Sequence, residues 1–259
     1  MANDQSIALV TGASSGIGKT YADRLARRGY NLVLVARDVS RLEALATQLR
    51  ADTGVTIEVL PADLTQPEQV KAVEDRLRAE PPVTLLVNNA GAASHEGFAA
   101  DDLNPLYQLV DLNVVALTRL CGAAVQGFRA HGVEGSIINI GSVVGFAPEW
   151  LPGVYGASKA YVLALSRAIQ AELQGDIYVQ AVLPSGTKTE IWERSGRSVN
   201  DNMMDVGELV DAALVGFDRH EAVTIPPLLD VKYYDELEAA RKTLLPHLNG
   251  PHAAQRYLK

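Results

Sequence analysis

Ile-Ala-Leu-Val-Thr-Gly-Ala-Ser-Ser-Gly-Ile-Gly, residues 7–18, is the stretch of this sequence that decides the fold. Its apolar start predicts a buried strand, and the helical repeat of apolar residues that follows over residues 19–29 predicts a helix. A glycine-rich turn between a strand and a helix presents backbone N–H groups to a pyrophosphate. The stretch therefore predicts a dinucleotide-binding turn, whose contacting residues are Gly12, Ser14, Ser15, Gly16, Ile17 and Gly18.

Each glycine of this turn has an expected purpose. Gly12 permits the tight turn, Gly16 lets the backbone approach the pyrophosphate, and Gly18 lets the helix pack closely on the strand. A turn with chance glycines is the alternative. The strand before it and the helix after it argue against that alternative.

Further apolar runs alternate with amphipathic segments along the chain. These runs are continuous rather than alternating, as in strands buried on both faces: residues 32–36, 55–60, 85–87, 137–140, 177–183 and 223–225. Repeated strand–helix units predict an α/β fold, a doubly wound Rossmann-type parallel sheet of about seven strands with helices on both faces. No Pro/Gly/Ser-rich linker divides the sequence, so we expect one dinucleotide-binding catalytic domain over residues 1–259.

Two helix starts can be predicted from local side chains. Ser40 and Glu43 have the spacing of a capping box, which predicts a helix start at Ser40. Asp205 and Glu208 have the same spacing and predict a second start.

Composition limits the possible partners. The net charge of −8 argues against binding to nucleic acid or to an anionic membrane. No apolar run approaches the length of a membrane span, and residues 1–6 lack the features of a signal peptide. Cys121 is the only cysteine, so no internal disulfide can form, which fits a reducing compartment. We therefore expect a cytoplasmic protein, and no Cys/His spacing predicts a metal site.

The glycine spacing Thr-Gly-x3-Gly-x-Gly resembles that of the short-chain dehydrogenase/reductase family, single-domain subgroup, and further motifs follow in that family's order. The resemblance implies four catalytic residues: Asn113, Ser142, Tyr155 and Lys159, the last two in a Tyr-x3-Lys motif. It also implies that Tyr155 and Lys159 contact the cofactor, together with Asp63, Leu64, Asn89, Ala90, Gly91, Pro184, Gly186, Thr187 and Thr189. One departure is Pro184-Ser185-Gly186, where the family has Pro-Gly. We expect a displaced turn there, with Gly186 supplying conformational freedom.

Tyr155 and Lys159 can together move a proton. Residues four apart on a helix lie on one face, and a neighbouring cation lowers the pKa of a tyrosine. We therefore expect Tyr155 to be tuned toward neutral pH as a general acid/base for the alcohol or carbonyl oxygen, while the cofactor carries the hydride. Ser142 is expected to position the substrate oxygen. By the resemblance, Asn113 holds a water that connects Lys159 to solvent.

The end of the second strand predicts NADP rather than NAD. Enzymes that prefer NAD place an acidic residue there to bind the ribose 2′-hydroxyl, whereas this chain has Ala36 followed by Arg37. A guanidinium suits a 2′-phosphate, and Ser14 adds a hydroxyl. Asp38 either contacts the ribose or caps the next helix. Arg41 is either a second phosphate contact or a solvated helix residue, and the solvated residue is slightly favoured.

The substrate side is less readable. Phe146, Trp150, Leu151 and Trp192 predict an apolar cleft for an uncharged aldehyde, ketone or alcohol, with His95 and Glu96 as polar additions. Residues 188–204 predict a substrate lid. The resemblance implies a homodimer or homotetramer, and residues 228–259 are expected to cover the pocket or an interface. The alternatives are an NAD-dependent alcohol dehydrogenase of the same family, an epimerase or dehydratase, and a non-catalytic dinucleotide-binding sensor.

Overall fold

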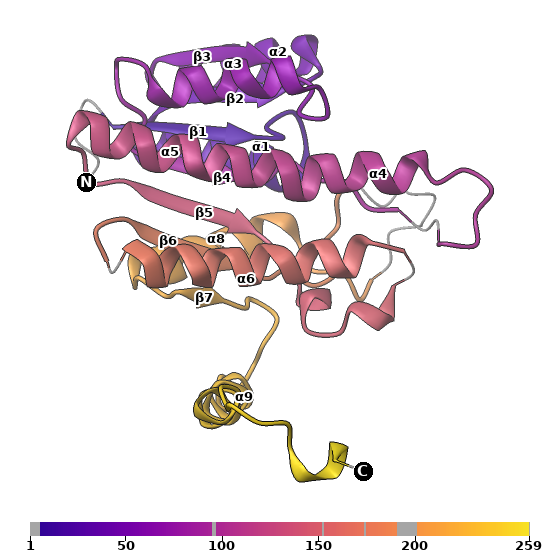
Figure 1. Ribbon diagram of the computed structural model, residues 1–259. Helices are drawn as coiled ribbons and strands as arrows, with labels where there is room; N and C mark the ends of the chain where they lie inside the picture. Colours follow the sequence, from indigo (N-terminus) through magenta and orange to yellow (C-terminus); the bar gives the residue numbers. More distant parts are fainter. Residues whose placement is uncertain (1–5, 95–96, 152, 174, 191–200, 259) are drawn as a thin grey trace. The chain divides into compact units, whose positions relative to one another are not determined.

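Seven parallel strands form a single sheet, in the order β3-β2-β1-β4-β5-β6-β7 (Figure 1). The chain moves outward from β1 in one direction and then returns to β4 on its other side. Ligands bind at such a reversal in open α/β sheets, beyond the carboxyl ends of the strands. The predicted Rossmann-type sheet is confirmed, with these strands: β1 (Ile7–Thr11), β2 (Asn31–Ala36), β3 (Ile57–Pro61), β4 (Leu85–Asn88), β5 (Ser136–Ile140), β6 (Tyr178–Val182) and β7 (Val223–Thr224).

Helices cover both faces of the sheet, because successive strand residues point to opposite sides. Leu9, Val33 and Leu86 face one layer, while Val10, Leu34 and Val87 face the other. The first layer holds α3 (Pro67–Arg78), α5 (Leu117–His131) and α6 (Tyr155–Leu173); the second holds α1 (Gly16–Arg27), α2 (Val39–Thr53) and α8 (Val206–Asp218). The remaining elements are α4 (Asn104–Val110), the π-helical turn η1 (Asp111–Ala116), α9 (Lys232–Leu244) and the short 3-10 turns η2 (Val143–Gly145), η3 (Pro148–Trp150), η4 (Leu245–His247) and η5 (Gln255–Tyr257).

The computed structural model describes the chain except for residues 1–5, 95–96, 152, 174, 191–200 and 259. Two compact units are distinguished, Met1–Pro226 and Pro227–Lys259, and the second contains α9. The expectation of one catalytic domain over residues 1–259 stays a prediction.

One of the two predicted helix starts is wrong. The N-cap of α2 is Asp38, whose Oδ1 accepts a hydrogen bond from the backbone N–H of Arg41 at 3.0 Å. The helix therefore begins before Ser40, because a carboxylate two residues earlier already satisfies a free N–H group. The other start is confirmed: Asp205 caps α8.

The continuous helix Asn104–His131 is long and apolar enough to cross a membrane by length and composition alone, since an 18-residue window within it has a mean hydropathy of 1.3. It contains no continuous apolar run of that length, because Asp111, Asn113 and Arg119 interrupt it. Several of its apolar side chains are part of the core: Leu117, Leu120 and Phe128 are buried against the sheet and α3, whereas Tyr107 and Val115 are exposed. Packing of this kind is that of a core helix.

Two glycines of α5 test this packing. A Cβ added at Gly127 would overlap the backbone carbonyl of Leu77 in α3, whereas Gly122 has open space around it. Gly127→Ala should lower the free energy of unfolding by about 1–3 kcal/mol because the α3–α5 contact must open. Gly122→Ala should raise it by up to about 1 kcal/mol through helix propensity. Urea unfolding measures both, and equal effects of the two variants would contradict the close packing.

Candidate active site

The glycine-rich turn is fixed to the end of β4. The Thr11 hydroxyl oxygen accepts hydrogen bonds from the backbone N–H groups of Asn89 (3.0 Å) and Ala90 (2.9 Å). The Asn89 side chain donates to the Thr11 carbonyl at 2.8 Å. Gly12 has a φ of +66°, and a Cβ on Gly18 would overlap the Gly12 carbonyl and the Asn89 amide. The tight turn and the close helix packing expected of these two glycines are both present. Thr11 is a supporting residue that the sequence analysis missed.

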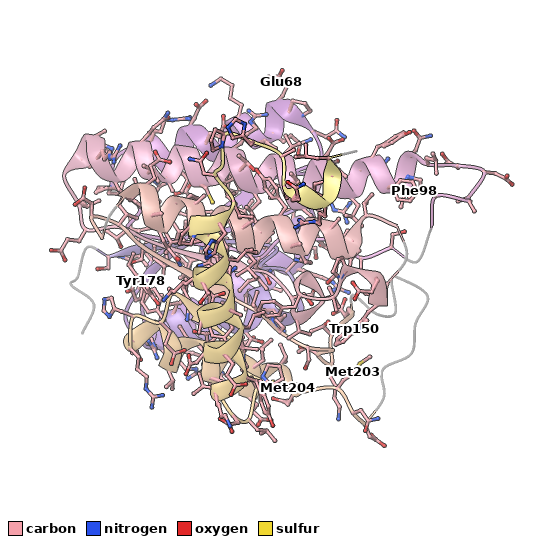
Figure 2. The ribbon with its side chains drawn as sticks, turned by 60° about the horizontal axis from the view of Figure 1, so that its bottom comes forward. Glu68, Phe98, Trp150, Tyr178, Met203 and Met204 are labelled. Atoms are coloured by element: carbon pink, nitrogen blue, oxygen red, sulfur yellow. The ribbon has the colours of Figure 1, made fainter. Side chains whose placement is uncertain are left out.

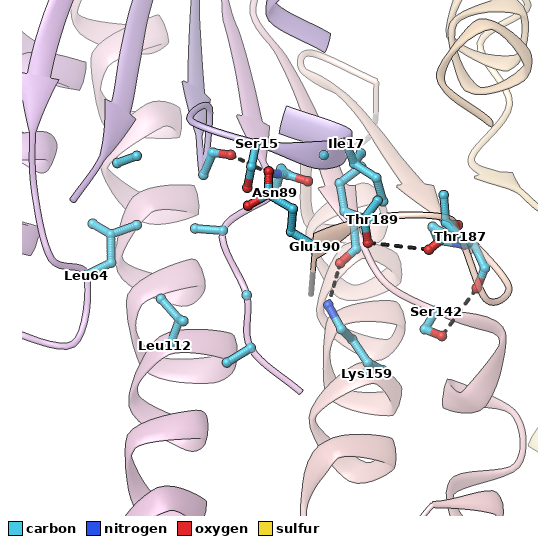
Figure 3. Close-up of a pocket in the computed structure, with 18 of the residues that line it drawn as sticks. Ser15, Ile17, Leu64, Asn89, Leu112, Ser142, Lys159, Thr187, Thr189 and Glu190 are labelled. Atoms are coloured by element: carbon cyan, nitrogen blue, oxygen red, sulfur yellow. Dashed lines mark hydrogen bonds between the residues drawn. The ribbon is translucent and has the colours of Figure 1, made fainter. Parts of the chain in front are cut away.

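The N-terminus of α1 is open toward the site. Ser15 has extended backbone at the N-cap, its side chain makes no capping hydrogen bond, and the first turn carries no acidic residue. Ser15, Gly16 and Ile17 line a cleft at the carboxyl edge of the sheet (Figure 3). The residues present therefore fit a dinucleotide, because free N–H groups at a helix start stabilise a pyrophosphate.

The cleft has a volume of about 370 Å³. Side chains from the glycine turn, the end of β4, α6 and the loop after β6 face one another across it (Figure 3). Every predicted catalytic and cofactor-binding residue lines this cleft except Gly18, which packs beneath the turn, and Asn113. The structure adds lining residues that the sequence analysis assigned neither to catalysis nor to the cofactor: Thr65, Leu112, Val144 and Glu190.

Lys159 is buried at the start of α6, with 7% of its surface exposed. Its Nζ donates to the Ile140 carbonyl at 3.0 Å and lies 5.9 Å from the centroid of the Tyr155 ring. The Tyr155 hydroxyl hydrogen-bonds the Ser142 side chain, which in turn donates to the Pro184 carbonyl at 3.2 Å. The ends of β5 and β6 and the first turn of α6 thus meet at one hydroxyl.

Burial sets the pKa values of this pair. It raises the pKa of Tyr155 to about 12, opposed by the hydrogen bond to Ser142, and it lowers the pKa of Lys159 to about 8. The expectation that Lys159 tunes Tyr155 toward neutral pH is therefore wrong for the free protein. Loss of hydration outweighs the effect of the ammonium, which is directed to the Ile140 carbonyl.

Asn113 lies behind the cleft, in the π-helical turn η1. Its Oδ1 accepts from the Ala92 N–H at 2.9 Å, and its Nδ2 donates to the Ala92 carbonyl (3.0 Å) and the Ser158 hydroxyl (3.1 Å). Asn113 and Lys159 both lie beside Gly91: a Cβ on Gly91 would be 3.3 Å from Asn113 Oδ1 and 3.6 Å from Lys159 Nζ. The expected water between Asn113 and Lys159 stays a prediction.

The turn after β6 differs from the expectation for Gly186. This glycine is not among the described residues with positive φ, so its conformational freedom is not used. Its carbonyl instead accepts from the Met204 N–H at 2.9 Å, and the Lys188 N–H donates to the Met204 carbonyl at 2.9 Å. These bonds join the two ends of the predicted lid over residues 188–204, of which residues 191–200 lie outside the described part.

The corner of the cleft at the end of β2 contains Arg37, whose side chain is 70% exposed and lies 3.9 Å from Asp63. Asp38, which the sequence left open, caps α2. Its carboxylate is therefore committed to a helix start, and Arg37 remains accessible at the cleft edge. Asp63 itself accepts from the Thr65 N–H and hydroxyl, which fixes this side of the cleft.

The substrate end is only partly described. Leu151 lines the cleft as predicted. The prediction is wrong for Phe146 and Trp150, which do not line it and are 38% and 69% exposed (Trp150 and the exposed Phe98 are labelled in Figure 2). Trp192, His95 and Glu96 lie outside the described residues.

Cys121 is buried and hydrogen-bonded with Asn88 and Asn139, and burial raises the pKa of its thiol to about 12, which fits packing rather than nucleophilic chemistry. Among the described residues, no group of three His, Cys, Asp or Glu side chains is placed to hold a metal ion.

Residues 6–200 match the family model of the short chain dehydrogenases. The chain belongs to this family. Membership confirms the predicted class, an oxidoreductase that uses a nicotinamide dinucleotide. The chain is 34% identical over 188 residues to human 17-beta-hydroxysteroid dehydrogenase type 3, covering 70% of this chain but only 59% of that enzyme's length. It is 37% identical to sulfoacetaldehyde reductase 2 of Chromohalobacter salexigens, covering 71% and 73%.

Two solved structures are more similar along the whole chain. A short-chain dehydrogenase from Sphingobium yanoikuyae in complex with NADPH is 53% identical, with a TM-score of 0.93 over 97% of this chain and 100% of that chain. The bulky-bulky ketone specific alcohol dehydrogenase from Comamonas testosteroni is 50% identical, with a TM-score of 0.91 over 99% and 100%.

Lys159→Met tests the cost of burying the ammonium. The unfolded wild type binds a proton at Lys159 below about pH 10.5, whereas the folded protein binds it only below about pH 8. As the pH falls through this window, the wild type should lose about 3 kcal/mol of unfolding free energy relative to the variant, at roughly 1.4 kcal/mol per pKa unit. Below the window the difference should be constant. Urea unfolding of both proteins measures it, and a difference that does not change with pH would contradict the lowered pKa.

Proposed function

We propose that this chain is an NADP(H)-dependent oxidoreductase that interconverts a ketone or aldehyde with an alcohol, with Tyr155 as the general acid/base. The observation that carries the proposal is the Ser142–Tyr155–Lys159 cluster at a cleft whose far end is the open N-terminus of α1. A dinucleotide bound along that cleft reaches both ends. The Sphingobium protein, which binds NADPH, and the Comamonas ketone dehydrogenase support the assignment.

The protein's part in the reaction is to place and protonate one oxygen. When bound, the nicotinamide supplies or accepts the hydride. Ser142 hydrogen-bonds the substrate oxygen and holds it at the Tyr155 hydroxyl, which gives up its proton when a carbonyl is reduced. With a pKa of about 12, Tyr155 is protonated at neutral pH, the form that reduction requires. The Lys159 ammonium stabilises the phenolate that remains.

The preference for NADP rests on Arg37. It is exposed at the end of β2, where a 2′-phosphate would lie, and Asp38 is occupied as the N-cap of α2. A guanidinium beside a phosphate forms strong charge-assisted hydrogen bonds. The alternative is that the protein prefers NAD, and the nucleotide titrations described below distinguish the two.

The proposed substrates are uncharged ketones with a bulky group on each side of the carbonyl. The similarity to the Comamonas enzyme supports this class. Val143, Val144 and Leu151 add apolar surface beside Ser142 in the cleft, which suits such groups. The cytoplasmic location and the homodimer or homotetramer stay predictions.

The direct experiment is a spectrophotometric screen of NADPH and NADH against bulky diaryl or aryl-alkyl ketones, small aldehydes and charged sugars. We expect NADPH oxidation with the bulky ketones. Turnover confined to charged sugars would contradict the substrate class. Tight NADPH binding without turnover of any carbonyl would indicate a dinucleotide sensor.

Tyr155→Phe keeps the ring and removes the proton. We expect kcat for ketone reduction to fall at least about a hundredfold, the usual contribution of a general acid. NADPH affinity should change little, because the ring still packs beside Lys159. Near-native turnover of the variant would show that another group donates the proton.

Arg37→Asp reverses the charge at the corner of the cleft. We expect Kd for NADPH to rise at least about tenfold, because a charge-assisted hydrogen bond is replaced by repulsion. Kd for NADH should fall or stay unchanged. Fluorescence titration with each nucleotide measures the ratio of Kd for NADPH to Kd for NADH. The same ratio in the variant and the wild type would contradict the NADP assignment.

A further inference from the structure

An ion pair joins two elements that flank the glycine turn. Nη1 of Arg41, in the first turn of α2, lies 2.6 Å from Oε2 of Glu190, in the segment that follows β6. Glu190 lines the cofactor cleft (Figure 3), and Arg41 lines the adjoining hollow together with Ser14 and Ser15. The tip of Arg41 is therefore within hydrogen-bond distance of a side chain that faces the cofactor.

Carboxylates already surround Arg41. Besides Glu190, the Asp38 Oδ2 lies 3.5 Å from its Nε. The contact with Glu190 is the larger cause that raises the pKa of Arg41, so the guanidinium stays charged. In the same corner, and within the described residues, the ion pair of Arg37 is with Asp63 alone, at 3.9 Å. One arginine is thus accessible to an added anion, and the other is engaged by a carboxylate that an anion could replace.

We propose that Glu190 and the 2′-phosphate of NADP compete for Arg41, which makes Glu190 a residue that sets the preference between NADP and NAD. This inference rests on the proposed function, in which the cleft binds NADP and Arg37 contacts the phosphate. A phosphate monoester carries about −1.5 to −2 charges and three acceptor oxygens, so it attracts the guanidinium more strongly than one carboxylate does. NAD has an uncharged hydroxyl there and leaves the ion pair intact.

A different role for the Arg41–Glu190 ion pair predicts different effects on the affinities for NADP and NAD. Arg41 could serve only to neutralise Glu190, whose free carboxylate would repel the pyrophosphate that NADP and NAD share. Loss of Arg41 would then weaken both cofactors equally. Competition affects only the cofactor that carries the 2′-phosphate.

The test is a double-mutant cycle of Glu190→Gln and Arg41→Gln, read as Kd for NADPH and NADH at one fixed ionic strength. We expect Glu190→Gln to lower Kd for NADPH about twofold to fivefold, the range that corresponds to the free energy of an exposed ion pair. Arg41→Gln should weaken NADPH about tenfold, the loss of one charge-assisted hydrogen bond. Neither variant should change Kd for NADH by more than about twofold, and Glu190→Gln should have no effect once Arg41 is replaced.

Glu58→Gln is the matched control. Glu58 pairs with Arg76 at 2.8 Å, and its side chain is 44% exposed, against 43% for Glu190. The substitution changes the net charge equally, so it separates a local effect from a general one. We expect no change in the NADPH to NADH ratio, and thermal unfolding confirms that every variant is folded.

Three outcomes overturn the inference. One is that Glu190→Gln changes the Kd values for NADPH and NADH by the same factor. Another is an effect of Glu190→Gln that persists without Arg41. The third is weaker binding of both NADPH and NADH by Arg41→Gln, with the affinity for both restored when Glu190→Gln is added. That result would show that Arg41 serves to neutralise Glu190. If NADPH remains preferred and depends on Arg37 in these cases, only the competition fails. If the wild type does not prefer NADPH, the proposed cofactor fails with it.

Discussion

The burial of one ammonium group is the constraint on which the candidate active site depends. Lys159 sits beneath the Tyr155 ring with its Nζ bonded to the Ile140 carbonyl at the end of β5. A charged amine loses most of its hydration there, and within the described part of the chain the hydrogen bond to the Ile140 carbonyl replaces only part of it. Such a position is costly for folding. Its value is chemical, because an ammonium held in low dielectric stabilises a nearby phenolate far more than a solvated one does.

The rest of the fold supplies the surroundings that keep this group in place. Gly91 leaves the space through which Asn113 approaches Lys159, and the π-helical turn η1 directs the Asn113 amide to Ala92 and Ser158. On the opposite side of the cleft, Thr11 ties the glycine turn to the end of β4. Parallel strands that end at one edge therefore place the glycine turn and the Ser142–Tyr155–Lys159 cluster on the same cleft. In the proposed function, a cofactor bound between them connects the two.

The sequence predicts the fold because its evidence is local. A run such as residues 32–36 is apolar enough to be a buried strand in any context, and the glycine turn is recognisable from its spacing. The positions of Ser142, Tyr155 and Lys159 at the cleft also follow, since they belong to motifs that end strands or start helices. Asp38 shows what local sequence cannot decide. Its position was compatible with either a helix cap or a ribose contact, and the geometry of α2 shows that it is the cap.

What the sequence misses depends on contacts between distant residues. The pKa of Tyr155 could not be derived from a four-residue spacing, because burial by surrounding strands outweighs the neighbouring charge. The pairing of Arg41 with Glu190 joins residues 149 positions apart, and neither stands in a motif. Thr11 stands in the glycine motif, but its supporting role depends on distant partners, since Asn89 and Ala90 lie 78 and 79 residues away.

The titration of Lys159 itself tests the central claim most directly. The chain has seven lysines, so their side-chain NMR signals can be resolved in protein labelled with ¹³C-lysine, and the spectrum of a variant without Lys159 assigns its signal. The account predicts that this one amine titrates with a pKa of about 8 in the free protein. A pKa at the ordinary value of about 10.5 would mean that the ammonium is solvated, and would contradict the buried proton relay.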